Sequence, residues 1–153
     1  RRAGVRRRVE PDMIHCIWLK FMGNVSENLP CALLGVPYGA YREGWPADGI
    51  RRALMAEVAA VARAEAGVEL TEEDMALRNR IVYNQDPASR PSTLQDLDRG
   101  RQTEVGLFAG AVVRLGEKHG IPTPVSAVML QGIRALEAKN AGTIPGLPEA
   151  ARG

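Results

Sequence analysis

The sequence predicts an all-α fold of about six helices, and three observations support that expectation. Apolar residues recur at helical spacing through most of the chain, and glycines and prolines separate the periodic stretches. The only run that suits a strand is residues 5–9, which would belong to a preceding domain. The 153 residues, of which 45% are apolar and 25% charged, are enough to bury the core of one domain.

Six stretches have helical periodicity, and local signals set their boundaries. They are residues 12–29, 49–66, 71–83, 93–99, 103–118 and 124–139. Pro46 suits a helix start, and Gly67 and Gly120 suit the positions just after a helix. Thr71 followed by Asp74 predicts a capping box, in which two side chains bond the backbone at the start of a helix.

The positive charge of the chain is concentrated at its start. The net charge is +2, but residues 1–10 carry +4 and the remainder −2. A basic stretch can bind nucleic acid or an acidic membrane, yet there is no second basic patch and no aromatic-rich strand that would stack bases. We therefore favour a solvated connector, with neither nucleic acid nor membrane as a partner. No apolar run approaches the roughly 18 residues of a membrane helix, so we expect a cytoplasmic protein.

The cysteines and histidines predict neither a disulfide nor a metal site. Cys16 and Cys31 would lie about 22 Å apart along one helix by helical rise, which is beyond the reach of a disulfide. Two reduced thiols are typical of a cytosolic protein. His15 and His119 have no clustered cysteine or carboxylate at ligand spacing.

Three polar residues in the first predicted helix form the strongest local pattern. Lys20, Asn24 and Asn28 are four residues apart, so they stack along one stripe of a helix. The apolar residues predicted to face the core are Ile14, Ile17, Phe21, Val25 and Leu29. The polar stripe lies about 100° from that face, at the boundary of the core. It suits the lining of a cleft for a small, oxygen-rich ligand, and it also suits a solvated flank with a helix-capping asparagine.

Three blocks of the sequence form a recognisable series. The first is the polar stripe, preceded by Trp18-Leu19; the second is residues 92–104, and the third is residues 110–124. In this order they resemble the C-terminal domain of the ketopantoate reductase (2-dehydropantoate 2-reductase) family. The second block is similar to that family's Ser-Met-x-x-Asp, Gly, Thr-Glu signature, with a threonine in place of the methionine. The resemblance spans about residues 3–139.

The resemblance implies a domain organisation. The fold would be the helical one of the 6-phosphogluconate dehydrogenase C-terminal domain, over residues 12–140, with an interdomain connector over residues 1–11 and a flexible tail over residues 141–153. The family also carries an N-terminal Rossmann domain that binds NADPH, and this chain has no Gly-x-Gly-x-x-Gly motif after a strand. We therefore expect a fragment that turns over no substrate by itself.

The resemblance also implies catalytic and binding roles. Lys20 would stabilise the alkoxide left by hydride transfer from NADPH and donate a proton to it. Glu104, at the junction of substrate and nicotinamide, would orient Lys20 or hold a substrate hydroxyl. Asn24, Asn28 and Ser92 would bind the substrate, a small 2-keto acid.

Each of these residues also has a purely structural interpretation. Lys20 could lay its stem on an aromatic neighbour, and Asn28 could end a helix. Ser92 could cap the helix that follows it. Glu104 could interact with a helix dipole.

The leading prediction is the C-terminal domain of an NADPH-dependent reductase that converts ketopantoate to pantoate in pantothenate biosynthesis. Glu27 and Tyr38 depart from many relatives beside the inferred pocket, so a sister reductase for another 2-keto acid is the second prediction. The third, a non-catalytic helical dimerisation module, predicts that the candidate residues do not converge in space. The expected partners are the 2-keto acid and the Rossmann domain, and a homodimer is left open. Asp96 and Arg101 are expected to form a structural pair.

Overall fold

The computed structural model describes residues 11–149, and every regular element in that range is helical. In order, the elements are α1 Pro11–Gly23, the π-helix η1 Asn24–Asn28, α2 Leu29–Leu34, the 3-10 turn η2 Tyr38–Ala40, α3 Pro46–Ala66, α4 Glu72–Tyr83, α5 Ser92–Asp98, α6 Ala109–His119 and α7 Pro124–Asn140. The all-α prediction is confirmed. The candidate strand at residues 5–9 lies outside the described residues.

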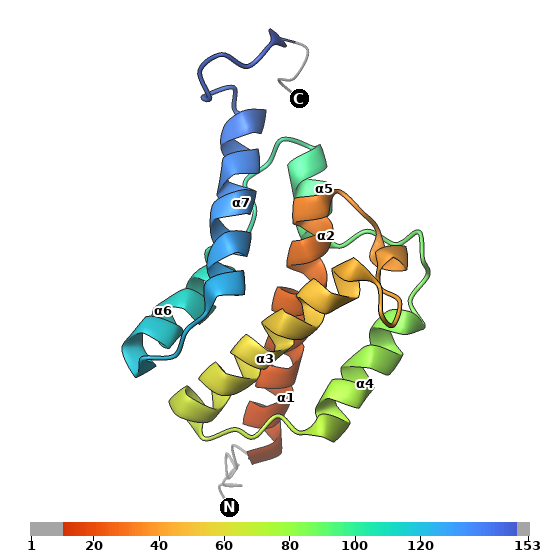
Figure 1. The fold of residues 1–153 in the computed structure, drawn as a ribbon, viewed down its shortest axis with the longest axis vertical. Coiled ribbons are helices and arrows are strands. Elements are labelled where there is room, and N and C mark those ends of the chain that lie inside the picture. The colour runs from red at the N-terminus through yellow and green to blue at the C-terminus, as the bar shows by residue number, and fades with distance from the viewer. Residues whose placement is uncertain (1–10, 150–153) are drawn as a thin grey trace, which may run out of the picture.

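The helices α1, η1 and α2 run end to end as one rod through the middle of the molecule (Figure 1). α3 crosses this rod, α4 lies on one side of it, and α6 and α7 pair on the other. Counted with the rod as one unit and without the 3-10 turn η2, the described residues form six helical units, as predicted. The rod continues past the predicted end at residue 29 and stops at Gly35, whose φ of 66° ends the helix in the left-handed conformation.

The core forms where α3, α6 and α7 close on the second half of the rod. Its fully buried side chains include Met22, Val25, Leu29, Leu54, Val58, Val112 and Ile133. Burial of each such side chain contributes on the order of 2 kcal/mol. The predicted apolar face is therefore correct for Val25 and Leu29.

The first half of that predicted face is wrong. Ile14 and Ile17 are 39% and 60% exposed, and Met13 beside them is 54% exposed. The reason is tertiary, because no helix within residues 13–149 covers this side of α1, and helical periodicity alone does not reveal that. Contact with the core begins at Trp18 and Phe21, whose rings pack edge to face with centroids 5.6 Å apart.

Besides the end of the rod, the predicted helix boundaries hold at most places and fail at one. Thr71 and Asp74 form the predicted capping box at the start of α4, and Gly67 ends α3 with a φ of 63°. The helix expected from residue 103 is shorter than predicted and begins at Ala109, because residues 104–108 form successive turns. This difference changes the surroundings of one candidate residue, Glu104.

Three further features bear on the class of protein. Within residues 11–149, no helix is both long and apolar enough to cross a membrane. Cys16 is exposed and Cys31 is buried, and both are free thiols. No group of three or more potential metal-ligating side chains clusters in the same range.

Candidate functional site

The central rod widens at η1, the five-residue π-helix that carries two of the candidate residues. A π-helix closes i→i+5 hydrogen bonds and occurs frequently at functional sites. Asn24 and Asn28, at its two ends, are half-buried, whereas the three residues between them are buried. Lys20, on α1, is exposed. Lys20, Asn24 and Asn28 therefore do not form the straight stripe predicted from their four-residue spacing, because a π-turn holds more residues than an α-turn.

Asn28 does not end a helix. Its backbone is helical, with a φ of −80° and a ψ of −40°, and the rod continues through it. The hydroxyl of Tyr38 donates a hydrogen bond to Asn28 Oδ1 at 2.9 Å. The helix-termination interpretation is therefore wrong, and the amide nitrogen is the end of this side chain that points away from Tyr38.

Ser92 is the first residue of α5, and the capping interpretation for it is wrong. The N-cap position is taken by the preceding proline, no side chain caps the helix, and Ser92 is exposed. α5 packs against both η1 and α2. Two backbone hydrogen bonds of 2.9 Å join the loop before α5 to η2: Tyr38 N–H to the Ser89 carbonyl and Gly39 N–H to the Pro87 carbonyl. The segment that leads into Ser92 is thereby joined to the turn that holds Asn28.

Glu104 lies in the turn before α6, and two contacts fix that turn. The backbone N–H and the hydroxyl of Thr103 both donate to Glu137 Oε1 of α7, each at 2.7 Å. Phe108, at the end of the turn, packs against Phe21 of α1 with ring centroids 6.4 Å apart. The turn is held between α7 and α1, while Glu104 itself is exposed. Because α6 starts only after this turn, the helix-dipole interpretation of Glu104 is wrong.

The block that contains Ser92 and Glu104 is folded back on itself between them. Arg101 Nη2 donates to Asp96 Oδ1 at 2.6 Å, and the Arg101 backbone N–H donates to the Asp96 carbonyl at 2.8 Å. Gly100, with a φ of 65°, allows the chain to reverse there. The predicted structural pairing of Asp96 and Arg101 is confirmed.

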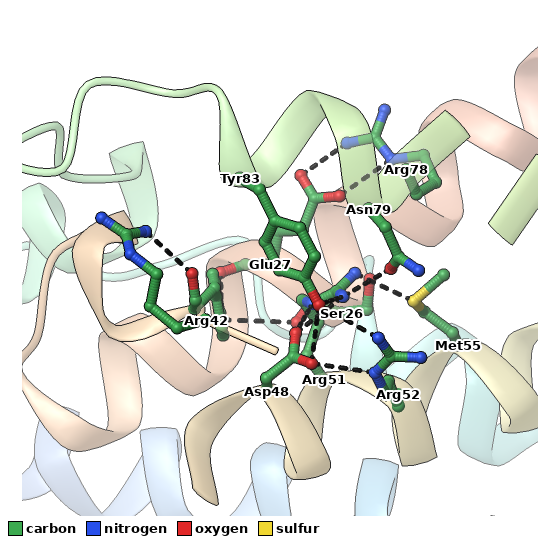
Figure 2. A network of polar contacts seen from close by, with 11 residues as sticks. Ser26, Glu27, Arg42, Asp48, Arg51, Arg52, Met55, Arg78, Asn79 and Tyr83 are labelled. Carbon is green, nitrogen blue, oxygen red and sulfur yellow. Dashed lines mark hydrogen bonds and ion pairs between the residues drawn. The ribbon is translucent and has the colours of Figure 1, made fainter. Parts of the chain in front are cut away.

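A buried polar network joins α3 to α4, and Figure 2 shows its side chains converging between the two helices. Asp48 accepts hydrogen bonds from Arg51 at 2.7 Å, from Arg52 at 2.8 Å and from Tyr83 at 2.8 Å. Arg51 is fully buried and also donates to Asn79 at 2.6 Å. Charged groups tolerate burial only when they are paired in this way, so the network fixes α4 against α3.

The network shifts the protonation of its central carboxylate. Burial raises the pKa of Asp48, whereas hydrogen bonds from Arg52, Arg51 and Tyr83 lower it. The lowering is larger than the rise, so the pKa of Asp48 lies below its ordinary value. This cluster was not predicted from the sequence. The spacing of Asp48 to the two arginines is that of a helical ion pair, but nothing local indicates the contribution of α4.

Glu27 is a second buried carboxylate, and its partner is Arg78 of α4. Arg78 Nε and Nη2 donate to its two carboxylate oxygens at 2.8 and 2.5 Å, the bidentate pair seen in Figure 2. Burial raises the pKa of Glu27, and Arg78 offsets this rise only in part. Gly23 leaves the space that the guanidinium occupies, since a methyl group there would overlap it. Glu27 therefore anchors α4 to the rod.

The structure joins the elements that carry the five candidate residues. η1 contacts α5, η2 holds Asn28, and the Glu104 turn packs on the end of α1 that carries Lys20. Lys20, Ser92 and Glu104 are each exposed, and no hydrogen bond or ion pair joins their side chains within residues 11–149. A hollow of about 290 Å³ near the Glu104 turn is lined by none of the five candidates, but by residues 100–102, α7 and Ala141 just after it. That the five candidates act on one ligand stays a prediction.

The architecture defines the class as an all-α domain built around one central helical rod. Residues 12–137 match the family described as "Ketopantoate reductase PanE/ApbA C terminal". The chain belongs to this ketopantoate reductase family and corresponds to its C-terminal domain.

Curated relatives carry the name of one oxidoreductase. Over 131 residues the chain is 36% identical to the 2-dehydropantoate 2-reductase of Vibrio cholerae, a match that covers 83% of the chain and 42% of that protein. Over 138 residues it is 33% identical to the 2-dehydropantoate 2-reductase of Archaeoglobus fulgidus, covering 90% of the chain and 46% of that protein. The chain therefore spans less than half the length of these relatives.

Solved structures share the fold. A PanE/ApbA family ketopantoate reductase from Ralstonia eutropha JMP134 matches with a TM-score of 0.75 and 35% identity, over 83% of this chain and 42% of that one. D-mandelate dehydrogenase in a ternary structure with NADH and anilino(oxo)acetate matches with a TM-score of 0.77 and 25% identity, over 88% of this chain and 55% of that one.

Proposed function

We propose that this chain is the substrate-binding and catalytic helical domain of an NADPH-dependent reductase that converts ketopantoate to pantoate in pantothenate biosynthesis. The observation that carries the proposal is the family match over residues 12–137. Curated relatives at 36% and 33% identity bear the name of that activity.

The nucleotide would be held mainly by a second domain. The described residues contain no strand and hence no strand–glycine-rich loop–helix unit, the usual cradle for a dinucleotide phosphate. Bound NADPH supplies the hydride. We assign this phosphate-binding unit to an N-terminal Rossmann domain of the same protein. The exposed apolar residues Met13 and Ile17 on α1 suit burial against such a domain.

The candidate residues would divide the remaining chemistry. Lys20 is exposed and has no ion-pair partner among the described residues, so its ammonium can stabilise the developing alkoxide and donate a proton to it. Glu104, on its anchored turn, would orient Lys20 or accept a hydrogen bond from a substrate hydroxyl. Asn24, Asn28 and Ser92 would donate hydrogen bonds to the oxygens of the keto acid.

A second candidate function is favoured by a specific observation. The D-mandelate dehydrogenase neighbour has a TM-score of 0.77 to this chain, and the anilino(oxo)acetate in that structure carries the oxo-acetate group of 2-keto acids. A sister reductase for a different 2-keto acid is therefore the second candidate.

The test is NADPH oxidation by the full-length protein offered ketopantoate and a panel of other 2-keto acids. A clear preference for ketopantoate supports the first function, and a preference for another acid supports the second. A folded protein that binds NADPH and oxidises it with none of these acids contradicts both, and leaves the helical dimerisation module as the interpretation.

Lys20→Ala tests the chemistry. Loss of the proton donor should lower kcat by roughly 10²- to 10⁴-fold, without loss of the fold because Lys20 is exposed. The matched control is Lys139→Ala, which removes another exposed lysine from α7 and should leave kcat unchanged. Near-normal turnover by the Lys20 variant contradicts the proposed role.

A further inference from the structure

Tyr38 contacts a candidate substrate-binding residue, and the proposed function gives it no role. From the turn η2, its hydroxyl donates to Asn28 Oδ1 at 2.9 Å in a partly buried setting. We propose that Tyr38 is a positioning residue that holds the Asn28 carboxamide with its NH₂ group toward the ligand, so that Asn28 donates a hydrogen bond to a carboxylate or carbonyl oxygen of the keto acid. This inference rests on the proposed function.

Tyr38 is itself held from two sides. Its backbone N–H donates to the Ser89 carbonyl at 2.9 Å. Its ring packs against the ring of Tyr41, with centroids 6.4 Å apart and planes at 42°. Tyr41 is fully buried, and its hydroxyl donates to the Glu27 carbonyl at 2.6 Å. Because its neighbours are fixed, the Tyr38 hydroxyl meets Asn28 without a further cost of ordering.

The Tyr38 hydroxyl keeps its proton through the physiological range. Burial raises the pKa of Tyr38, and the nearby charge of Glu27 raises it further, to about 12. It is therefore a constant donor to Asn28. A carboxamide has one acceptor end and one donor end, so a donor that occupies Oδ1 leaves the NH₂ group facing the other way.

The orientation of this amide decides what it recognises. An outward NH₂ group donates to a carboxylate, and the charge of the acceptor strengthens that hydrogen bond. The opposite orientation would present a carbonyl oxygen and repel the same carboxylate. A 2-keto acid offers only acceptor oxygens at its carboxylate and keto groups, so the orientation set by Tyr38 is the one that fits this class of ligand.

Tyr38→Phe in the full-length protein separates positioning from simple packing. The substitution keeps the ring and its contact with Tyr41 but removes the hydrogen bond to Asn28. We expect KM for the preferred 2-keto acid to rise roughly 3- to 10-fold with kcat changed less than about twofold, which is the effect of one hydrogen bond on ground-state binding. The matched control is Tyr83→Phe, which removes a hydroxyl that donates to Asp48 at 2.8 Å and not to Asn28; it should leave KM unchanged.

The double substitution shows whether Tyr38 acts through Asn28. In an Asn28→Ala background, Tyr38→Phe should raise KM no further, because the group that it positions is gone. An unchanged KM for Tyr38→Phe alone, or an equal rise in both backgrounds, overturns the inference. If the wild-type protein reduces no 2-keto acid, the proposed function fails and this inference fails with it. If the wild-type protein reduces a 2-keto acid but Tyr38→Phe leaves KM unchanged, the inference about Tyr38 is overturned and the proposed function stands.

Discussion

Replacing Arg78 by alanine should destabilise the fold strongly. Glu27 is only 3% exposed, and both of its carboxylate oxygens are bonded to Arg78. Removing one partner of such a pair costs roughly 3 to 5 kcal/mol, because the other charge is left buried and unpaired. For a chain of this length, that corresponds to a fall in melting temperature of roughly 6 to 20 °C. Thermal and urea unfolding followed by far-UV circular dichroism would measure it.

The stability lost in Arg78→Ala should also depend on pH, and the protonation of Glu27 decides whether the loss grows or shrinks as pH rises. Its pKa is raised in the folded chain, chiefly by burial, and Arg78 is the main group that opposes the rise. A carboxyl whose pKa is raised on folding contributes stability that is present at low pH and is lost as pH rises through the folded-state pKa. The difference between variant and wild type should therefore be largest near about pH 8 and smaller near about pH 5, where more of Glu27 is protonated.

Two further variants serve as controls for Arg78→Ala. Arg90→Ala removes an ion pair with Asp98 in which both side chains are nearly half exposed, so it should cost less than about 1 kcal/mol. Glu27→Leu combined with Arg78→Leu removes both charges and should recover most of the stability that Arg78→Ala loses. A cost for Arg78→Ala no larger than that of Arg90→Ala, with no dependence on pH, would refute the argument.

Three other changes have expected outcomes. Gly23→Ala places a methyl group where the Arg78 guanidinium lies and should lower the free energy of unfolding by about 1 to 3 kcal/mol in urea. Glu57→Gln weakens the charge-assisted bonds from Ser126 N–H at 2.8 Å and Oγ at 2.6 Å, so amide hydrogen exchange at the start of α7 should accelerate. Asp48 has a lowered pKa, so it contributes stability at neutral pH that is lost as pH falls through its folded-state pKa. Asp48→Asn should therefore flatten the acid limb of the stability–pH curve.

Features that depend on neighbours along the chain were predictable from sequence. The capping box of Thr71 and Asp74 and the stop at Gly67 are both local and both appear in the structure. The exposure of Ile14 and Ile17 was not predictable, because it depends on which helices reach α1 and not on the periodicity of α1 itself.

The candidate site was likewise predictable only in part. Its residues were identified from the resemblance of short blocks to a family, and the family is confirmed over residues 12–137. The contacts that hold the site were not predictable. Glu27 and Arg78 are 51 residues apart in the sequence. The contact of Asn28 with Tyr38 depends on the direction of the turn that carries Tyr38, which local sequence preferences do not determine. The π-helix was missed because four-residue spacing fits an α-helix equally well.

The length of η1 determines how the two halves of the rod face one another. A π-turn fits one residue more than an α-turn into about the same rotation. Deleting one residue inside η1 would therefore restore a regular α-helix and leave Leu29 and Cys31, both fully buried, facing the core. Deleting one residue from α1 or α2, which have no surplus residue, would turn every side chain that follows by about 100°. The rod should therefore tolerate a one-residue deletion at η1 better than one in either α-helix.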